Sequence, residues 1–512
     1  MGAKPTALAG ARARLRGAPA LLIVCAAVGA LSLLLPSAPS YDPWAWIVWG
    51  REILWLELDT TGGPSWKPLP VLFTLLFAPL GEIDDAIPPA LWLIVARAGA
   101  VLAVVMAFRL ARRLTGSNGP AGIAAGVLAA TALVLTPQSL RYTAHGNEVP
   151  LAIALMLWAV DLHLDGRHRA TLVLGFLACL LRPEVFPFLA LYGLWIWRMD
   201  PDQRRVLIGL AAALPALWLV PEWIGSGNPL DAGRQATSEP SWSLSRVERP
   251  WLAVLERMHE VVGWPAEIGS ALAVAFAIVR RERAVLALAA AAVLWLALVV
   301  AMTEVAFSGN PRYFLPAAVI CCVLAGVGAA WLVAAAGRVH VGAGVAIASV
   351  LALATIPYLD GGQERLARQA RLAGDMVELE RQLNRAITAA GGPDRVAAAG
   401  PPSVNRVLMT QLAWEAEWSM GRLERTPGRA IVFSAPYRSA GWLARIDPSG
   451  GGRRRLARVG PWDVLAPLPL RTFSRLPADA PRLSQGKDGW TLPTGPPGGT
   501  ARAPRAAGPS PR

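Results

Sequence analysis

Long apolar runs recur along most of this chain, separated by short loops of Arg, Asp, Gly and Pro. Several runs reach about 18 to 22 residues, which is the length that an α-helix needs to cross the hydrocarbon core of a bilayer. With 54% hydrophobic and only 16% charged residues among 512, the chain does not have the composition of a water-soluble globule. The runs therefore predict an all-α polytopic membrane bundle over residues 18–358.

Positive charge at the ends of the runs predicts how the bundle is oriented. Residues 1–17 carry one lysine and three arginines before the first run, so the positive-inside rule places them in the cytoplasm. A cleaved signal peptide is the alternative for this run, but the following SAPS, residues 37–40, is a poor cleavage site. The basic turns then predict about eleven spans, which leaves the region after residue 358 outside the membrane.

The overall charge and the cysteines fit a membrane protein. The net charge is +14, but the arginines gather at the ends of runs and in the tail, so no nucleic-acid partner is expected. Cys25, Cys179, Cys321 and Cys322 all lie inside apolar runs, where we expect small core residues without a disulfide. A high content of Ala, Arg, Gly and Pro is typical of a GC-rich bacterial genome. We therefore expect a multi-pass protein of a bacterial plasma membrane, in contact with its lipids.

The first outer loop, residues 37–89, contains five of the 21 tryptophans. Its first apolar segment, PWAWIVWGREILWLEL, is interrupted by Gly50, Arg51 and Glu52, and its second, PLPVLFTLLFAPL, is bounded by prolines. Both segments favour helices that lie in the membrane interface, where indole rings sit at the depth of the headgroups. For residues 71–83, a short true span is the alternative.

The composition changes after residue 358. A long amphipathic stripe is followed by the strand-like segments RVAAAG, AIVFSAP and WDVLAP, which predict a small soluble α/β domain over residues 359–473. Residues 474–512 are rich in Pro, Gly, Arg and Ala and contain few core-forming side chains, so we expect a disordered tail.

Ionisable side chains gather on the outward side of the predicted bundle. Charged groups at membrane depth are costly, so their presence there indicates a functional site. The outward loops contribute Asp42, Lys67, Arg141, His145, Glu148, Arg182, Glu184, Arg312 and Tyr313. A helical bundle is able to bring these loops together at one end.

Two of these residues have plain structural alternatives. Asp42 stands before Pro43, a pair that is typical of a helix N-cap and the position after it, although a carboxylate there also suits a general base. A lysine at the membrane surface, such as Lys67, is usually a snorkelling residue. The sharper interpretation of Lys67 is a ligand for a lipid phosphate.

Two further residues are expected to be structural. His145 has no second His or Cys at ligand spacing, which favours a hydrogen-bonding role over a metal site. Arg97 lies inside the second span, where we expect it to pair with Asp84 or Asp85 and clamp the loop.

Short motifs follow one another in a distinctive order along residues 18–340. Asp42 comes just after the first span, and Lys67 lies in WKPLP at residues 66–70. The later motifs are ARRLTG at 111–116, LRYTAHGNEVPL at 140–151, RPE at 182–184 and RYFLP at 312–316. Together they resemble the GT-C superfamily of polytopic membrane glycosyltransferases, in particular its aminoarabinose transferase and protein O-mannosyltransferase branch.

The resemblance implies an enzyme that uses a polyprenyl-phosphate sugar as donor, in a single inverting displacement by an acceptor hydroxyl. It assigns Asp42 as the general base, with Glu148 either orienting the acceptor or helping the base. It assigns the donor phosphate to positively charged and aromatic side chains, namely Lys67, Arg141, Arg182, Arg312 and Tyr313. By analogy, it implies a mannose or arabinofuranose type of sugar and a glycan, lipid or protein acceptor in the cell envelope.

The chain also departs from the family pattern. The first loop lacks the paired acidic residues of several branches, and the acid of the second loop is Glu148 instead of an aspartate. No metal ligand is therefore named, and a divalent cation stays open as a cofactor. Two other functions remain as alternatives: a transporter or flippase of lipid-linked saccharide, and a non-catalytic envelope-assembly protein. The sequence shows no symmetry between halves of the kind that transporters often have.

Overall fold

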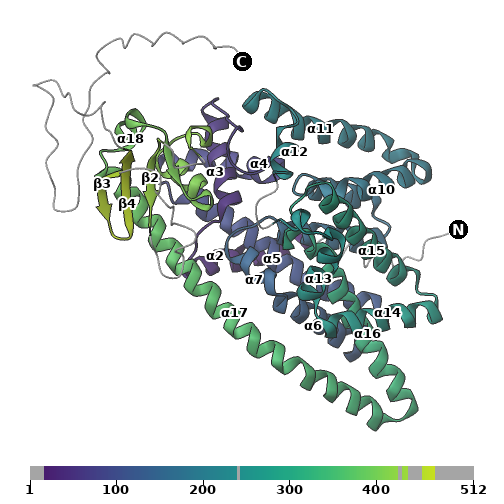
Figure 1. Cartoon of the computed structure of the whole chain (residues 1–512). Helices are drawn as coiled ribbons and strands as arrows, with labels where there is room; N and C mark the ends of the chain where they lie inside the picture. The colour runs from purple at the N-terminus through teal and green to yellow at the C-terminus, as the bar shows by residue number, and fades with distance from the viewer. Residues whose placement is uncertain (1–16, 239–242, 425–428, 436–452, 468–512) are drawn as a thin grey trace, which may run out of the picture. The chain divides into compact units, whose positions relative to one another are not determined.

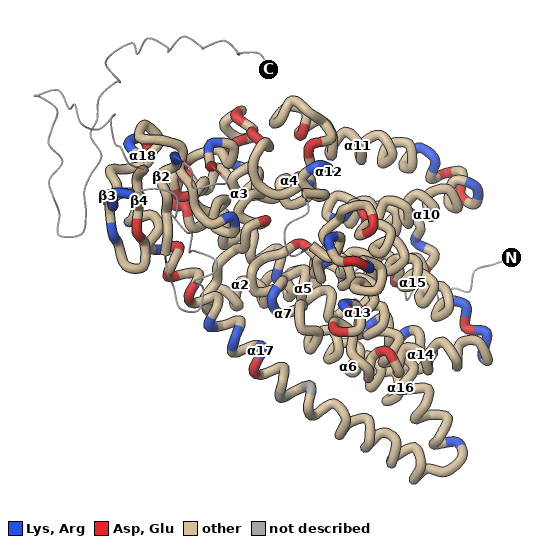
Figure 2. The backbone as a smooth tube through the Cα atoms, viewed as in Figure 1, with Lys and Arg blue, Asp and Glu red and all other residues tan. Residues whose placement is uncertain are grey.

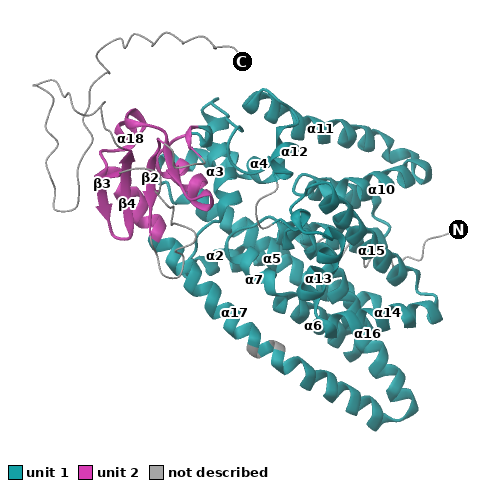
Figure 3. Cartoon of the chain, in the orientation of Figure 1, with its two compact units in different colours: residues 1–378, 419–421 teal, residues 379–418, 422–512 magenta. Residues whose placement is uncertain are grey.

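The structure is a computed structural model, and it describes residues 17–238, 243–424, 429–435 and 453–467. The chain divides into two compact units (Figure 3). One unit comprises residues 1–378 and 419–421, and the other comprises residues 379–418 and 422–512. The expected disordered tail, residues 474–512, lies outside the described residues, as does most of the N-terminal segment 1–17.

The first unit is built from helices (Figure 1). In chain order they are α2 Ala18–Leu31, η1 Ser32–Leu34, α3 Tyr41–Leu54, α4 Pro68–Phe77, η2 Ala78–Glu82, α5 Ile87–Leu114, α6 Pro120–Leu135, α7 Pro137–Ala144, α8 Val149–Leu164, α9 His168–Cys179, η3 Pro183–Val185, α10 Phe186–Met199, η4 Pro201–Gln203, α11 Arg204–Ser226, α12 Asp231–Ala236, η5 Leu244–Arg246, α13 Pro250–Val262, α14 Trp264–Arg280, α15 Arg283–Glu304, η6 Pro311–Tyr313, α16 Leu315–Val339 and α17 Val341–Ala389.

Many of these helices have the length and composition of membrane spans. Among the described residues, five are long and apolar enough to cross a membrane, or seven if two bent pairs each count as one span. Four shorter apolar helices have 10–17 residues. Figure 2 shows charged residues near helix ends and a long uncharged stretch in α17. The predicted all-α polytopic membrane bundle is confirmed, whereas the number of about eleven spans stays a prediction.

Small residues let the central helix α16 approach its neighbours closely. A side chain at Gly328 would collide with the backbone carbonyl of Gly269 in α14, and one at Gly326 would collide with that of Ala125 in α6. Such contacts are the usual way in which helices pack inside a membrane, where apolar surface gives no driving force for association between helices.

A buried carboxylate joins α5 to α8. Asp161 is 2% exposed, and its Oδ1 accepts a hydrogen bond from Arg113 Nη1 at 2.9 Å while its Oδ2 accepts one from Arg109 Nη2 at 3.2 Å. Arg113 also reaches Asp165 at 2.8 Å. The second arginine of the ARRLTG motif therefore fixes the packing of these two helices.

The tryptophan-rich segment forms the helix α3, and most of its indole rings are buried in the protein, whereas Trp55 just after the helix is 40% exposed. That α3 lies in the membrane interface stays a prediction. Trp46 and Trp49 are fully buried, and a ten-residue stretch from Pro43 to Glu52 is buried throughout. Trp46 packs edge-on against Trp92 of α5, with ring centroids 5.2 Å apart. The reason is that α3 packs against α4 and α5, so its aromatic side chains fill the protein interior. Whether α4 and η2 cross the membrane stays open.

The second unit combines the end of α17 with a four-stranded sheet. Its elements are α18 Pro393–Ala399, β1 Pro402–Val404, η7 Arg406–Leu408, α19 Met409–Glu415, β2 Ile431–Ser434, β3 Arg453–Val459 and β4 Trp462–Pro467. The strand order is β1-β2-β4-β3, with β1 and β2 parallel and the other pairs antiparallel. Trp462 Nε1 donates to the carbonyl of Leu379 at 3.0 Å, which ties the sheet to α17.

One expectation about this region needs correction. The segment RVAAAG is not a strand: it lies in α18, where Pro393 occupies the first turn and a run of alanines favours a helix. The last apolar run and the amphipathic stripe lie in one continuous helix, α17, with Pro357 inside it, and the domain bounds 359–473 stay a prediction. The segments AIVFSAP and WDVLAP supply β2 and β4 as predicted.

Candidate functional site

The charged residues that the sequence singles out come together at the starts of several helices in the first unit. Asp42 lies in the first turn of α3, Lys67 precedes α4 and Glu148 precedes α8. Arg182 precedes η3, which contains Glu184, and η6 contains Arg312 and Tyr313.

Glu148 is the centre of a buried ion-pair network. Its Oε1 pairs with Lys67 Nζ and accepts a hydrogen bond from Arg182 Nη1 at 3.2 Å. Arg182 Nη2 reaches Glu184 Oε1 at 3.0 Å. These four side chains are at most 8% exposed. Burial alone would raise the pKa of the Glu148 carboxyl, but Lys67 and Arg182 outweigh burial and lower that pKa to about 2.

Asp42 and Arg312 form a second ion pair, beside this network. Arg312 Nη1 donates to Asp42 Oδ2, and the two side chains are 24% and 14% exposed for Arg312 and Asp42. The carbonyl of Arg312 accepts a bond from Arg182 Nη2 at 3.4 Å. The Tyr313 ring contacts both guanidinium groups, whose carbons lie 4.9 Å (Arg182) and 5.7 Å (Arg312) from its centroid. The two ion pairs are thus coupled through η6.

The first residue of α3 explains why Asp42 is free for this pairing. Ser40 is the N-cap residue of α3, so Asp42 is the second residue of the helix and does not cap it, contrary to the structural alternative. The Ser40 N–H donates to the carbonyl of His145 at 3.0 Å, and His145 Nδ1 lies 3.2 Å from the carbonyl of Ala38. These bonds tie the start of α3 to the segment that leads into Glu148.

Arg97 also links the segment before α3 to the end of α7, and it does not make the expected pair with Asp84 or Asp85. Its guanidinium donates to the carbonyl and hydroxyl of Ser32, to the hydroxyl of Ser37 and to the carbonyl of Ala144, at 2.7–3.1 Å. The expectation was wrong because the segment after α2 presents the acceptors of Ser32 and Ser37 to this guanidinium.

Helix α11 holds the residues that precede Lys67. Pro221 in this helix has no N–H, so the Leu217 carbonyl four residues earlier lacks its usual helical partner. That carbonyl instead accepts a hydrogen bond from Trp66 Nε1 at 3.1 Å. Lys67 itself lies over the Trp46 ring, 5.5 Å from the centroid. The position of Lys67 is therefore fixed from both sides.

The remaining predicted residues lie around the cluster. Arg141 is exposed on α7, and among the described contacts its side chain joins neither ion pair. The neighbouring Tyr142 donates to Asn310 Oδ1 at 2.8 Å, and Asn310 also accepts from the N–H of Arg312 at 3.1 Å. The sequence analysis missed Asn310. Its signal was the pair Asn-Pro before RY, which is typical of a capped turn.

Several buried polar atoms of the cluster have no partner within the part of the chain that the structure describes. They are Trp46 Nε1, Glu148 Oε2, Arg182 Nε, Glu184 Oε2 and Arg312 Nε. Buried polar atoms are usually satisfied, so this concentration marks a place built to receive further hydrogen-bonding groups. In the same described ranges, no three His, Cys, Asp or Glu side chains are arranged to hold a metal ion.

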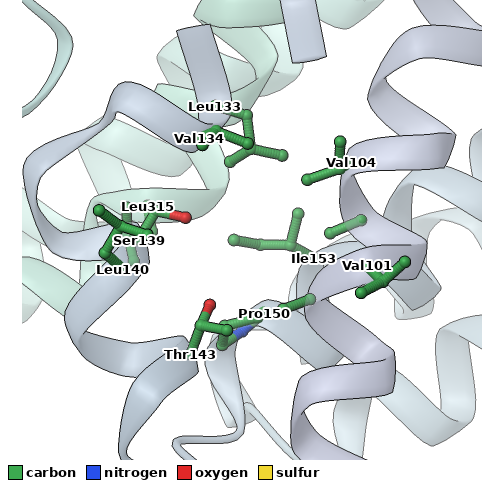
Figure 4. A pocket seen from close by; sticks show the side chains of 12 residues that line it. Val101, Val104, Leu133, Val134, Ser139, Leu140, Thr143, Pro150, Ile153 and Leu315 are labelled. Atoms are coloured by element: carbon green, nitrogen blue, oxygen red, sulfur yellow. The ribbon is translucent and has the colours of Figure 1, made fainter. Parts of the chain in front are cut away.

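An apolar cavity of about 160 Å³ lies between helices of the first unit (Figure 4). Its lining includes Thr143, Pro150 and Leu315, which are near neighbours in the sequence of Tyr142, Glu148 and Tyr313. The rest of the wall comes from α5, α6, α7 and α8 and is almost entirely aliphatic. The cavity wall and the charged cluster therefore use neighbouring residues of the same segments.

Comparison with solved structures identifies the fold. The chain is similar to ArnT from Cupriavidus metallidurans bound to undecaprenyl phosphate, with a TM-score of 0.50 and 14% identity over 88% of this chain and 98% of that one. The apo state of the same protein matches with a TM-score of 0.48, 15% identity and the same coverage. No family model and no curated protein matches the chain. The first of these similarities shows that the chain shares the fold of that protein, as the resemblance predicts.

Proposed function

We propose that this protein is a glycosyltransferase that moves a sugar from a polyprenyl-phosphate donor to an acceptor outside the cytoplasm. The observation that carries the proposal is the Asp42–Arg312 pair, which lies partly accessible beside a buried charge network in a GT-C fold. A carboxylate next to a guanidinium provides, within one site, a proton acceptor and a partner for a phosphate.

In the proposed reaction, an acceptor hydroxyl attacks the anomeric carbon and its proton passes to Asp42. The bond between that carbon and the phosphate oxygen breaks, so the configuration inverts and polyprenyl phosphate leaves. Negative charge then develops on the phosphate, and Arg312 is placed to stabilise it. No general acid is required because a phosphate is a good leaving group.

The other cationic residues have supporting parts in this proposal. Lys67 and Arg182 are buried and already paired, so they hold Glu148 and η6 in place and add positive potential behind the phosphate. Tyr313 orients the Arg312 side chain, and Arg141 supplies positive charge from the exposed face of α7. Glu148 helps the acceptor or the base through its unpartnered Oε2.

The lipid part of the donor is proposed by analogy with the similar structure, which contains undecaprenyl phosphate. The aliphatic cavity lined by Thr143 and Pro150 suits isoprene units and not a sugar, because it offers few polar groups. A mannose or arabinofuranose type of sugar and a glycan, lipid or protein acceptor of the envelope complete the proposal.

The proposed topology follows from the site. Residues 1–17 would lie in the cytoplasm of a bacterial cell, and residues 18–358 would form the catalytic module in the plasma membrane. Residues 359–473 would form the soluble domain on the outer side. Cysteine labelling with a membrane-impermeant reagent, at single cysteines placed in each region of an otherwise cysteine-free protein, tests these assignments.

The function is tested by incubating membranes that contain the protein with radiolabelled polyprenyl-phosphate mannose and arabinofuranose. Protein-dependent incorporation of label into envelope material, with release of polyprenyl phosphate, is the expected result. Passage of intact lipid-linked sugar across sealed vesicles without transfer would instead establish the transporter alternative. Loss of envelope assembly on truncation at residue 359, with no change for Asp42→Asn, would establish the assembly alternative.

A further inference from the structure

We propose that Arg312 masks the general base and that the donor phosphate unmasks it, so that the donor has to bind before the acceptor hydroxyl is activated. This inference rests on the proposed function and adds to it an order of events. In the structure, Arg312 pairs with one oxygen of the Asp42 carboxylate, Oδ2, and a neighbouring cation lowers the proton affinity of a carboxylate as a whole.

The accessibility of the ion pairs identifies the Asp42–Arg312 pair as the one that exchanges. Lys67, Glu148, Arg182 and Glu184 are buried, with side chains 0–8% exposed, so exchanging their partners would leave charges in the interior. Arg312 and Asp42 are 24% and 14% exposed, so a ligand phosphate is able to reach this pair from solvent or lipid.

The Arg312 side chain is able to change partner while its backbone stays in place. Asn310 Oδ1 accepts from the Arg312 N–H, and Arg182 donates to the Arg312 carbonyl, which fixes η6. The guanidinium still has a buried Nε with no partner among the described residues. Because a guanidinium presents a planar fork of donors, it is able to bind a phosphate in a bidentate manner.

The charge balance of the site agrees with this exchange. The three cations Lys67, Arg182 and Arg312 face three carboxylates, so the formal charges cancel. A phosphodiester carries one negative charge, and when it pairs with Arg312 it leaves one carboxylate unpaired, namely Asp42. After transfer Asp42 holds the proton of the acceptor hydroxyl, and that proton is released to water when polyprenyl phosphate leaves and Arg312 returns.

The test measures the affinity of the purified, full-length protein in nanodiscs for undecaprenyl phosphate, with undecaprenol as the probe that lacks phosphate. Removing the competing carboxylate by Asp42→Asn is expected to tighten phosphate binding by about tenfold, which corresponds to about 1.4 kcal/mol. Asp85→Asn is the matched control, since Asp85 is an exposed aspartate of the same loop, and it is expected to leave the affinity unchanged.

A double-mutant cycle separates exchange from simple repulsion between Asp42 and the phosphate. If Arg312 has to leave Asp42, the tightening by Asp42→Asn disappears in an Arg312→Gln background, because no pair remains to be broken. Equal tightening in both backgrounds, or none in the native background, overturns the inference while the proposed function stands. No phosphate-dependent binding by the unmodified protein would overturn the proposed function itself.

Discussion

Glu148→Gln is the substitution for which the structure predicts the largest effect on stability. Glu148 is fully buried and is the shared partner of Lys67 and Arg182. Its neutral replacement leaves two cations with Glu184 as the remaining buried carboxylate of the network. Removing one partner of a buried ion pair typically costs about 3–5 kcal/mol, and we expect a loss of this size in the free energy of unfolding.

The assay is unfolding of the purified protein in mixed detergent micelles, followed by tryptophan fluorescence. The matched control is Glu57→Gln, because Glu57 is exposed in the loop between α3 and α4, and a change within about 0.5 kcal/mol is expected for it.

Adding Lys67→Met to Glu148→Gln removes the unpaired cation, so the double variant should be about 1–3 kcal/mol more stable than the sum of the single losses predicts. The reasoning would be refuted if Glu148→Gln were as stable as the control, or if the stability losses of Glu148→Gln and Lys67→Met were strictly additive in the double variant. Either result would mean that the buried ion-pair network does not stabilise the site.

Three further predictions concern the helices around the site. Burial raises the pKa of the Glu52 carboxyl from 4.5 to about 8, so this group stays protonated in the folded protein at a pH where it is ionised in the unfolded chain. Stability therefore falls as pH rises from 4.5 to 8, by at most about 1.4 kcal/mol per pH unit. Glu52→Gln should make the melting temperature less dependent on pH between about pH 5 and 8. Asp161→Asn should lower stability by about 1.5–3 kcal/mol, because this buried carboxylate accepts bonds from two arginines of α5, and melting in detergent measures the loss. Gly50→Ala should lower the melting temperature clearly, because the new methyl group would lie 2.6 Å from the Thr74 backbone. In the control Gly209→Ala the methyl group meets nothing within 4 Å, so the melting temperature should not fall. Equal melting temperatures of the two variants would contradict the α3–α4 packing.

The membrane fold could be predicted from the sequence because length and hydrophobicity act locally. A run such as that in α16 is apolar over a full bilayer thickness, whatever its neighbours are. The burial of the tryptophans of α3 could not be predicted in this way, since an indole ring suits both the membrane interface and a protein interior. Burial of Trp46 comes from its packing against Trp92, and that contact joins residues far apart in the chain.

The candidate site could be predicted as a set of residues but not as a set of pairs. The rule that charges are costly at membrane depth selects Asp42, Glu148, Arg182 and Arg312 without any knowledge of their contacts. Partner choice depends on distances between loops, so the Asp42–Arg312 pair across 270 positions has no local signal. Arg97 shows the same limit: its acceptors are hydroxyl and carbonyl oxygens, which sequence alone does not distinguish from those of any other loop.

The most direct test of the proposed function is sugar transfer by the Asp42→Asn protein, in membranes supplied with a radiolabelled polyprenyl-phosphate sugar. The structure predicts a protein that folds and binds undecaprenyl phosphate, yet transfers sugar about 10² to 10⁴ times more slowly, while Asp85→Asn transfers at the native rate. Transfer at the native rate by a correctly folded Asp42→Asn protein would contradict the assignment of Asp42 as the general base, and with it the proposed mechanism.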